Sequence, residues 1–251
     1  MNYGYQNERD FVALFNNKFL YELSDHSKSF LKDLFGDTIN DTEKIICWKN
    51  NSTQKTDIYI RFKKYVKNIS IKSGNGNSIH SESVQDFKLY LEKLIIPYNI
   101  IDKYISYHYG YKRKDDGSID FSKVLSADEY KELYQSEIDI FNNYVNKTRI
   151  IIDMIDRFLI RGRYSEYEVD ALISGTVNDY VWILKDDLYD LILSKKNSKY
   201  TSPHIACITI GPKKRNIYSK EESKNDRYIV CARWNFIRDS IDEFKNNRME
   251  S

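Results

Sequence analysis

The chain has 251 residues and nearly balanced charge, with 39 lysines and arginines against 37 aspartates and glutamates. Its 41% hydrophobic and 14% aromatic residues exclude a disordered chain, because they supply enough apolar surface for a core. No run of about 18 apolar residues is present, which argues against a membrane span. The net charge of +2 gives weak support for a polyanionic partner, although basic groups can still cluster locally.

The cysteines and the first residues indicate the compartment. Cys47, Cys207 and Cys231 have no metal-ligand spacing, and an odd, sparse count fits reduced thiols in a core. The first ten residues, MNYGYQNERD, lack a basic and then apolar leader, so we expect no secretion signal. We therefore expect a cytoplasmic protein.

The N-terminal part predicts a helix followed by strands. Apolar residues recur every three or four positions from Phe11 to Phe19, and Glu8 lies on the same stripe. A carboxylate at the edge of a buried stripe can point into a site, although the helix dipole also favours an acid in a first turn. Strands are expected at 45–48, 57–62 and 69–72, with a polar connection over 63–68, a loop over 73–77 and a helix over 81–94.

The C-terminal part predicts further helices and strands. A tyrosine-rich polar stretch covers 98–126, with a turn at 114–117, and a capping box at Ser126 and Glu129 begins a helix towards Asn146 and on to Phe158. Strands are expected at 168–173, 180–184, 204–210 and 228–234, with a short helix after Asp186.

This order predicts an α/β (α+β) fold with a central mixed β-sheet flanked by helices. A boundary near Tyr98 would divide the chain into a core with the site at 1–97 and a part at 98–251. The second part would hold a helical insertion and further strands for recognition of a partner and dimerisation. A single domain over 1–251 with a helical insertion is equally economical.

One combination of residues carries chemistry. Asp57 begins one predicted strand and Lys72 ends the next, with twelve residues between Asp57 and Ser70. Side chains alternate along a strand, so Ser70 and Lys72 share the face opposite to Ile69 and Ile71. An unpaired lysine is costly to bury, so we expect Asp57, a metal-bound water or a phosphate beside Lys72. Metal-dependent cleavage of a phosphodiester needs such an acid and lysine.

Asp57, Ser70-Ile71-Lys72 and Glu8 together resemble the catalytic core of the PD-(D/E)XK nuclease superfamily, which includes many type II restriction endonucleases. The family pattern is an aspartate on one strand, an acid and a lysine one residue apart on the next, and often a glutamate on the preceding helix. The resemblance covers the N-terminal part, through the helix expected after the lysine strand. It implies a restriction-endonuclease-like core and Mg²⁺ as cofactor.

Two residues depart from that pattern: Thr56 stands where proline is common, and Ser70 stands where an acid is expected. Some members with Ser-X-Lys supply the missing carboxylate from the following helix. Here Glu82 and Asp86 are the candidates, four residues apart and therefore on one helical face. The resemblance of the segment that ends at Glu82 favours Glu82, and the spacing from Lys72 favours Asp86. Either would join Asp57 as a ligand of Mg²⁺, which prefers oxygen.

Other polar residues are candidates for contact with DNA. Lys72 would orient the attacking water, and Arg233 is of a type that reads guanine edges, although its neighbour Trp234 is also a core candidate. The remaining candidates would contact phosphate, or else are solvated loops or ordinary turns: Asn75, Asn77, Ser78, Arg161, Arg163, Lys213 and Lys214.

The resemblance thus implies a type II, Mg²⁺-dependent, sequence-specific endonuclease of double-stranded DNA. A homodimer is expected because two sites related by a two-fold axis cut both strands of a palindrome most simply, with a tetramer left open. A companion DNA methyltransferase is expected genetically, not as a stable subunit. Ser70 keeps a second possibility open, a non-catalytic DNA-binding or interaction protein on a decayed nuclease fold. A third is a structural protein in which Asp57 and Lys72 form only a salt bridge.

Overall fold

The computed structural model describes residues 3–52, 54–73, 77–163, 166–215 and 221–249. The chain forms two compact units, each assembled from separate segments. Unit 1 contains Met1–Asn77, Ile155–Leu191 and Asn235–Ser251, and unit 2 contains Ser78–Met154 and Ile192–Trp234. The expected boundary near Tyr98 falls inside unit 2. No single boundary in the sequence therefore separates the two units, because the chain passes from one to the other several times.

Unit 1 contains a five-stranded sheet in the order β1-β2-β3-β7-β8. Its strands are β1 (Ile46–Lys49), β2 (Ile58–Phe62), β3 (Tyr65–Lys72), β7 (Ala171–Thr176) and β8 (Asp179–Leu184). The β3–β7 pair is parallel, and the other pairs are antiparallel. The predicted α+β class with a central mixed sheet is confirmed.

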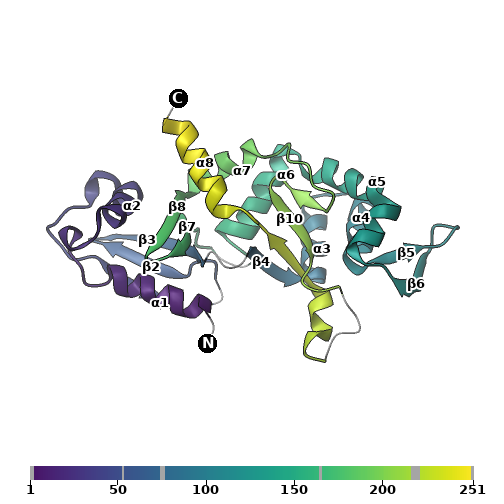
Figure 1. Ribbon diagram of the computed structural model, residues 1–251, viewed down its shortest axis with the longest axis horizontal. Coiled ribbons are helices and arrows are strands. Elements are labelled where there is room, and N and C mark those ends of the chain that lie inside the picture. Colours follow the sequence, from purple (N-terminus) through teal and green to yellow (C-terminus); the bar gives the residue numbers. More distant parts are fainter. Residues whose placement is uncertain (1–2, 53, 74–76, 164–165, 216–220, 250–251) are drawn as a thin grey trace. The chain divides into compact units, whose positions relative to one another are not determined.

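Helices pack on this sheet, and α1 lies along β1 and β2 (Figure 1). The helical elements of unit 1 are α1 (Tyr3–Phe15), η1 (Leu20–Glu22), α2 (Asp25–Phe35), η2 (Gly36–Thr38), the π-helical turn η3 (Asp156–Ile160), α7 (Lys185–Ser194) and α8 (Ile237–Met249). One face of the sheet meets α1 and α2 over an aromatic core, where Phe11 packs edge-on against Tyr180 with 5.2 Å between ring centroids. Each large side chain buried there contributes about 1.5–3 kcal/mol.

Unit 2 contains an antiparallel sheet in the order β4-β11-β10-β9 and a helical layer. Its elements are β4 (Ser78–Ser83), α3 (Val84–Lys93), α4 (Tyr98–Tyr109), β5 (Tyr111–Arg113), β6 (Ile119–Val124), α5 (Ala127–Val145), α6 (Thr148–Ile155), β9 (His204–Ile205), β10 (Ile208–Pro212), η4 (Glu221–Tyr228) and β11 (Ile229–Arg233). The β5–β6 hairpin continues from the end of α4 (Figure 1). The expected capping box is present at the N-cap of α5, because the Glu129 N–H donates to the Ser126 hydroxyl and the Ser126 N–H donates to the Glu129 carboxylate.

Two expectations about elements were wrong, and one helix was not placed in advance. The polar connection over 63–68 is largely strand, because Lys63 adopts a left-handed φ of 53° and allows a tight turn before Tyr65. The tyrosine-rich stretch after Pro97 is helical over α4. The helix expected over 81–94 begins only at Val84, because the preceding segment pairs with β11 as strand β4.

The cysteines and the helices agree with two further expectations. All three cysteines are free and buried, as expected of small core residues. Burial raises the pKa of both the Cys47 and Cys207 thiols to about 12. Within the described ranges, the helices are too short or too polar for any of them to cross a membrane.

Candidate active site

Asp57 is held by the main chain of the neighbouring strand. It directly precedes β2, and its N–H donates to the carbonyl of Ile69 at 2.8 Å, which places it opposite Ser70. Its carboxylate oxygen Oδ2 accepts from the Ile71 N–H at 2.6 Å and from the Ser70 hydroxyl at 3.1 Å. A carboxylate fixed by two donors on a strand is positioned before any ligand arrives.

Lys72 ends β3 beside this carboxylate. Its Nζ lies 4.0 Å from Asp57 Oδ2, and the two side chains are 18% and 24% exposed. A separation of 4.0 Å exceeds the hydrogen-bond range of about 2.7–3.2 Å, so the contact is electrostatic. The ammonium of Lys72 is therefore near the acid but not hydrogen-bonded to it. The expected juxtaposition of Asp57 and Lys72 is present.

Glu8 reaches the same region from α1. Its carboxylate pairs with the Nζ of Lys49 on β1 at 2.7 Å, and this Nζ lies 3.8 Å from the ring centroid of Tyr5. Glu8 and Asp57 both line a pocket of about 510 Å³. The other lining residues are Gly4, Tyr5, Lys49, Asn50, Asn51, Ser52, Gln54 and Thr56. The structure thus brings together Glu8 and Asp57, as the helical stripe predicted.

The residue types of this pocket fit a Mg²⁺ ion. Mg²⁺ is usually held by one or two carboxylates together with substrate phosphates and waters, and it prefers oxygen ligands. Asp57 and Glu8 supply two carboxylates to this pocket. The amide oxygen of Asn50 already accepts from the Ser52 N–H and hydroxyl, so it is engaged within the chain. Among the residues that the structure describes, no group of three or more His, Cys, Asp or Glu side chains could by itself hold a metal ion.

The two candidates for the missing acid lie in unit 2, and the expectation that they share a helical face was wrong. Glu82 lies on β4, opposite Val230 of β11, and its fully buried carboxylate is 3.1 Å from Nε2 of His80. Asp86 lies in the first turn of α3, where its N–H donates to the Ser83 hydroxyl at 3.0 Å. The Ser83 hydroxyl in turn donates to the Asp86 carboxylate, so Asp86 helps to cap α3.

Two of the three candidates in the loop after Lys72 are described. Asn75 lies outside the described residues. Asn77 donates its side-chain amide to Asn235 at 2.5 Å, and the Ser78 hydroxyl is 3.0 Å from the sulfur of Cys231. Both side chains therefore have partners within the chain.

The basic candidates are also engaged within the chain. Arg161 pairs with Glu168 and lies 3.9 Å from Asp156, and Arg163 is a half-buried residue in the turn after η3 that also interacts within the chain. Lys213 and Lys214 lie 3.0 and 3.8 Å from the carboxylate of Asp226. Arg233 donates to the carbonyl of Pro212 at 2.9 Å, and Trp234 is a core residue.

Sequence reasoning missed an aromatic pair near Asp57. Trp48 of β1 lies opposite Tyr59 of β2, with the rings stacked at a centroid distance of 5.3 Å. Tyr59 is two residues from Asp57 on the same strand face, about 7 Å along the strand. Trp48 is 38% exposed, so an aromatic surface lies beside the acid. The alternation of Tyr59 with Ile58 and Ile60 was a signal that could have found it.

No protein-family model matches this chain, and no curated protein was found with a similar sequence. The geometry of the pocket and the resemblance of its motif are therefore the two sources of a functional hypothesis.

Proposed function

We propose that this protein is a cytoplasmic, Mg²⁺-dependent, sequence-specific endonuclease of double-stranded DNA that acts as a homodimer. The observation that carries the proposal is the position of Asp57 at the start of β2 beside Lys72 at the end of β3. Glu8 from α1 lines the same pocket as Asp57. This set of residues on this order of elements is the pattern in which the chain resembles PD-(D/E)XK nucleases.

The reaction places negative charge on the attacking, nonbridging and leaving oxygens of a phosphodiester. Mg²⁺, when bound, supplies a polarised water and stabilises that charge. Asp57 would hold the ion through a carboxylate that the β3 main chain has already oriented. Lys72 would orient the attacking water and offset phosphate charge, and a positioned proton-transfer group contributes about 10²–10⁴ in rate.

Ser70 takes a different role from the acid that it replaces. Its side chain is almost fully buried, and its hydroxyl donates to Asp57, so it fixes that carboxylate. Glu8 is the second carboxylate at the pocket, with Lys49 as its partner. We propose Asp57 and Glu8 as the acids at the metal site. The assignment of Glu82 or Asp86 as a further ligand stays a prediction.

The test is incubation of the purified protein with unmethylated phage DNA, with Mg²⁺ or with EDTA, followed by gel electrophoresis. We expect discrete bands with Mg²⁺ alone, and none from the Lys72→Ala variant. Lys64→Ala is the matched control, because it removes an exposed lysine from the turn of the same sheet and should leave cleavage intact. Cleavage by Lys72→Ala at the rate of the unmodified protein would contradict the assignment.

A non-catalytic DNA-binding protein is the second candidate, and the serine at position 70 favours it. This function predicts metal-independent binding of DNA without nicking. The nuclease predicts binding in Ca²⁺ and cutting in Mg²⁺. A gel-shift measurement in Ca²⁺ and in EDTA, with the cleavage assay run in parallel, separates the two.

A further inference from the structure

Arg215 in unit 2 carries a buried charge with unused hydrogen-bond donors. It follows β10, and its Nη2 donates to the carbonyl of Tyr107 in α4. The centre of its guanidinium lies 4.5 Å from the centroid of the Tyr107 ring. Its Nε and Nη1 atoms are buried, and none of the described residues accepts a hydrogen bond from them. Since buried polar groups are nearly always hydrogen-bonded, two unused donors on one charged group require an explanation.

The groups around this guanidinium do not neutralise it. Burial lowers the pKa of Arg215, and burial raises the pKa of Tyr104 and Tyr130, so both phenols are uncharged. Glu137, which accepts from the Tyr130 hydroxyl, already pairs with Arg113 at 3.1 Å. Among the described residues no acid pairs with this buried charge, which is costly, so an anion from outside the chain would offset the cost.

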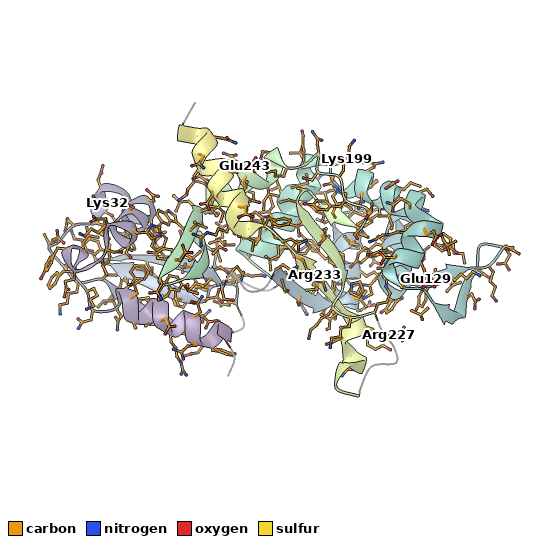
Figure 2. The ribbon with its side chains drawn as sticks, in the orientation of Figure 1. Lys32, Glu129, Lys199, Arg227, Arg233 and Glu243 are labelled. Carbon is orange, nitrogen blue, oxygen red and sulfur yellow. The ribbon has the colours of Figure 1, made fainter. Side chains whose placement is uncertain are left out.

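A basic pocket of about 260 Å³ lies at this position. Four of its lining residues are cationic: Lys213, Lys214, Arg215 and Arg233. Figure 2 labels Arg233 at the end of β11, where its guanidinium donates to the carbonyls of Pro212 and Lys213 and fixes the end of β10. The volume is just below the about 300–1,000 Å³ typical of sites for small molecules, which suits a group the size of a phosphate.

The charge count at the pocket favours an anion. Asp226 is the acid that pairs with Lys213 and Lys214, so one carboxylate serves two ammonium groups. Arg215 and Arg233 add two further charges, and the contacts of Arg233 described above are to neutral main-chain carbonyls. Counted over the residues that the structure describes, the pocket therefore carries more positive than negative charge, although the whole chain is nearly neutral.

We propose that this pocket binds a phosphate group, with the guanidinium of Arg215 as its principal donor. Guanidinium groups present paired N–H donors that match the oxygens of a phosphate, and Lys213 and Lys214 would add charge from the exposed side. Arg215 would turn away from the Tyr107 ring to present Nε and Nη1. The inference goes beyond the proposed nuclease, because its residues lie in unit 2 and none belongs to the Asp57 pocket.

The test is thermal unfolding of the full chain in EDTA, with inorganic phosphate replacing chloride at constant ionic strength. A site that binds only the folded protein should raise Tm by about 3–6 °C at a tenfold excess over Kd. The Arg215→Met variant should lose this rise, and in chloride its Tm should equal or exceed that of the unmodified protein. Arg149→Met, which removes an exposed arginine from α6, is the matched control and should keep the rise.

A second ligand separates the two sources of a phosphate group. If inorganic phosphate raises Tm through Arg215, the site takes a free phosphate. If only a short DNA duplex raises Tm and Arg215→Met weakens that effect, the site takes a backbone phosphate. The proposal is overturned if neither ligand raises Tm, or if Arg215→Met keeps the full rise. It is also overturned if Arg215→Lys, which keeps the charge and loses the paired donors, responds to both ligands as the unmodified protein does.

Discussion

The two units handle buried charge in opposite ways. In unit 1, Lys72 and Lys49 lie 4.0 and 2.7 Å from carboxylates, and all four side chains are about one-fifth exposed. In unit 2, the Arg215 guanidinium is buried against an aromatic ring and has two unpartnered nitrogens. The two lysines of unit 1 are therefore balanced by acids of the chain, whereas Arg215 of unit 2 is not. Removing Lys72 or Lys49 should weaken pairing in unit 1, and removing Arg215 should relieve a cost in unit 2.

The largest expected effect is on the cleavage rate of the Lys72→Ala variant, which should fall while the free energy of unfolding changes little. Lys72→Ala should lower the cleavage rate by about 10²–10⁴-fold, because the group that orients the water is lost. The free energy of unfolding should change by less than about 1 kcal/mol from the lost ion pair, since partly exposed pairs contribute little. Single-turnover cleavage and urea unfolding measure the two quantities. A large loss of stability with unchanged cleavage would assign Lys72 a structural role instead.

The next largest effect is the pH dependence of the free energy of unfolding, which reports on the positive charges around His108 in unit 2. Burial is the main reason that the pKa of His108 falls from 6.5 to about 4, and the charges of Arg215 and Arg227 lower it further. Between these pH values His108 binds more protons in the unfolded chain than in the folded one. Its contribution to the free energy of unfolding is therefore fully present above pH 6.5 and is lost as the pH falls towards 4. The loss should be roughly 3 kcal/mol.

Urea unfolding between pH 4.5 and 7 measures this dependence. Nε2 of His108 donates to the carbonyl of Arg227 at 2.8 Å, so His108→Gln keeps a donor at this position and removes the titration. Its stability should change less with pH than that of the unmodified protein. Arg215→Met should also raise the pKa of His108, because one nearby positive charge is removed. Equal slopes for the unmodified protein and His108→Gln would contradict this prediction.

The smallest effect tests the balanced pair of unit 1. A double-mutant cycle with Glu8→Gln and Lys49→Met should give an interaction energy of about 0.2–1 kcal/mol, as expected for a partly exposed pair. Urea unfolding of the two single variants and the double variant gives this value. An interaction energy of zero would mean that the 2.7 Å contact does not stabilise the fold, and the contrast between the units would then depend on Asp57 and Lys72 alone.

The parts of the site that local periodicity determines were predictable from the sequence. Alternation along β2 and β3 placed Asp57 and Lys72 on neighbouring strands, and the stripe of α1 placed Glu8 near them. Glu82 was misplaced because its strand depends on pairing with Val230, about 150 residues away, and a local pattern contains no such information.

Arg215 shows a second limit of the sequence. Whether an arginine is paired depends on which side chains from α4 and α5 surround it, so a run of three basic residues does not reveal a buried one. The helix α4 itself was missed because its tyrosines read as polar, although Tyr104 and Tyr107 are buried with Ile100 and Ile101. In both cases, the burial of Arg215 and the formation of α4, the outcome depends on tertiary contacts that the local sequence does not show.

The parallel pairing of β3 with β7 has a consequence for how the protein is made. β3 ends at Lys72 and β7 begins at Ala171, with most of unit 2 between them. At about 5–20 residues per second, a ribosome needs about 5–20 s to synthesise the roughly 100 residues that separate the two strands. During this interval the edge of β3 is without its native neighbour, and an unpaired strand edge is a site of aggregation. The nascent chain is therefore expected to require chaperone protection at this edge, and slower growth at low temperature should improve its soluble yield.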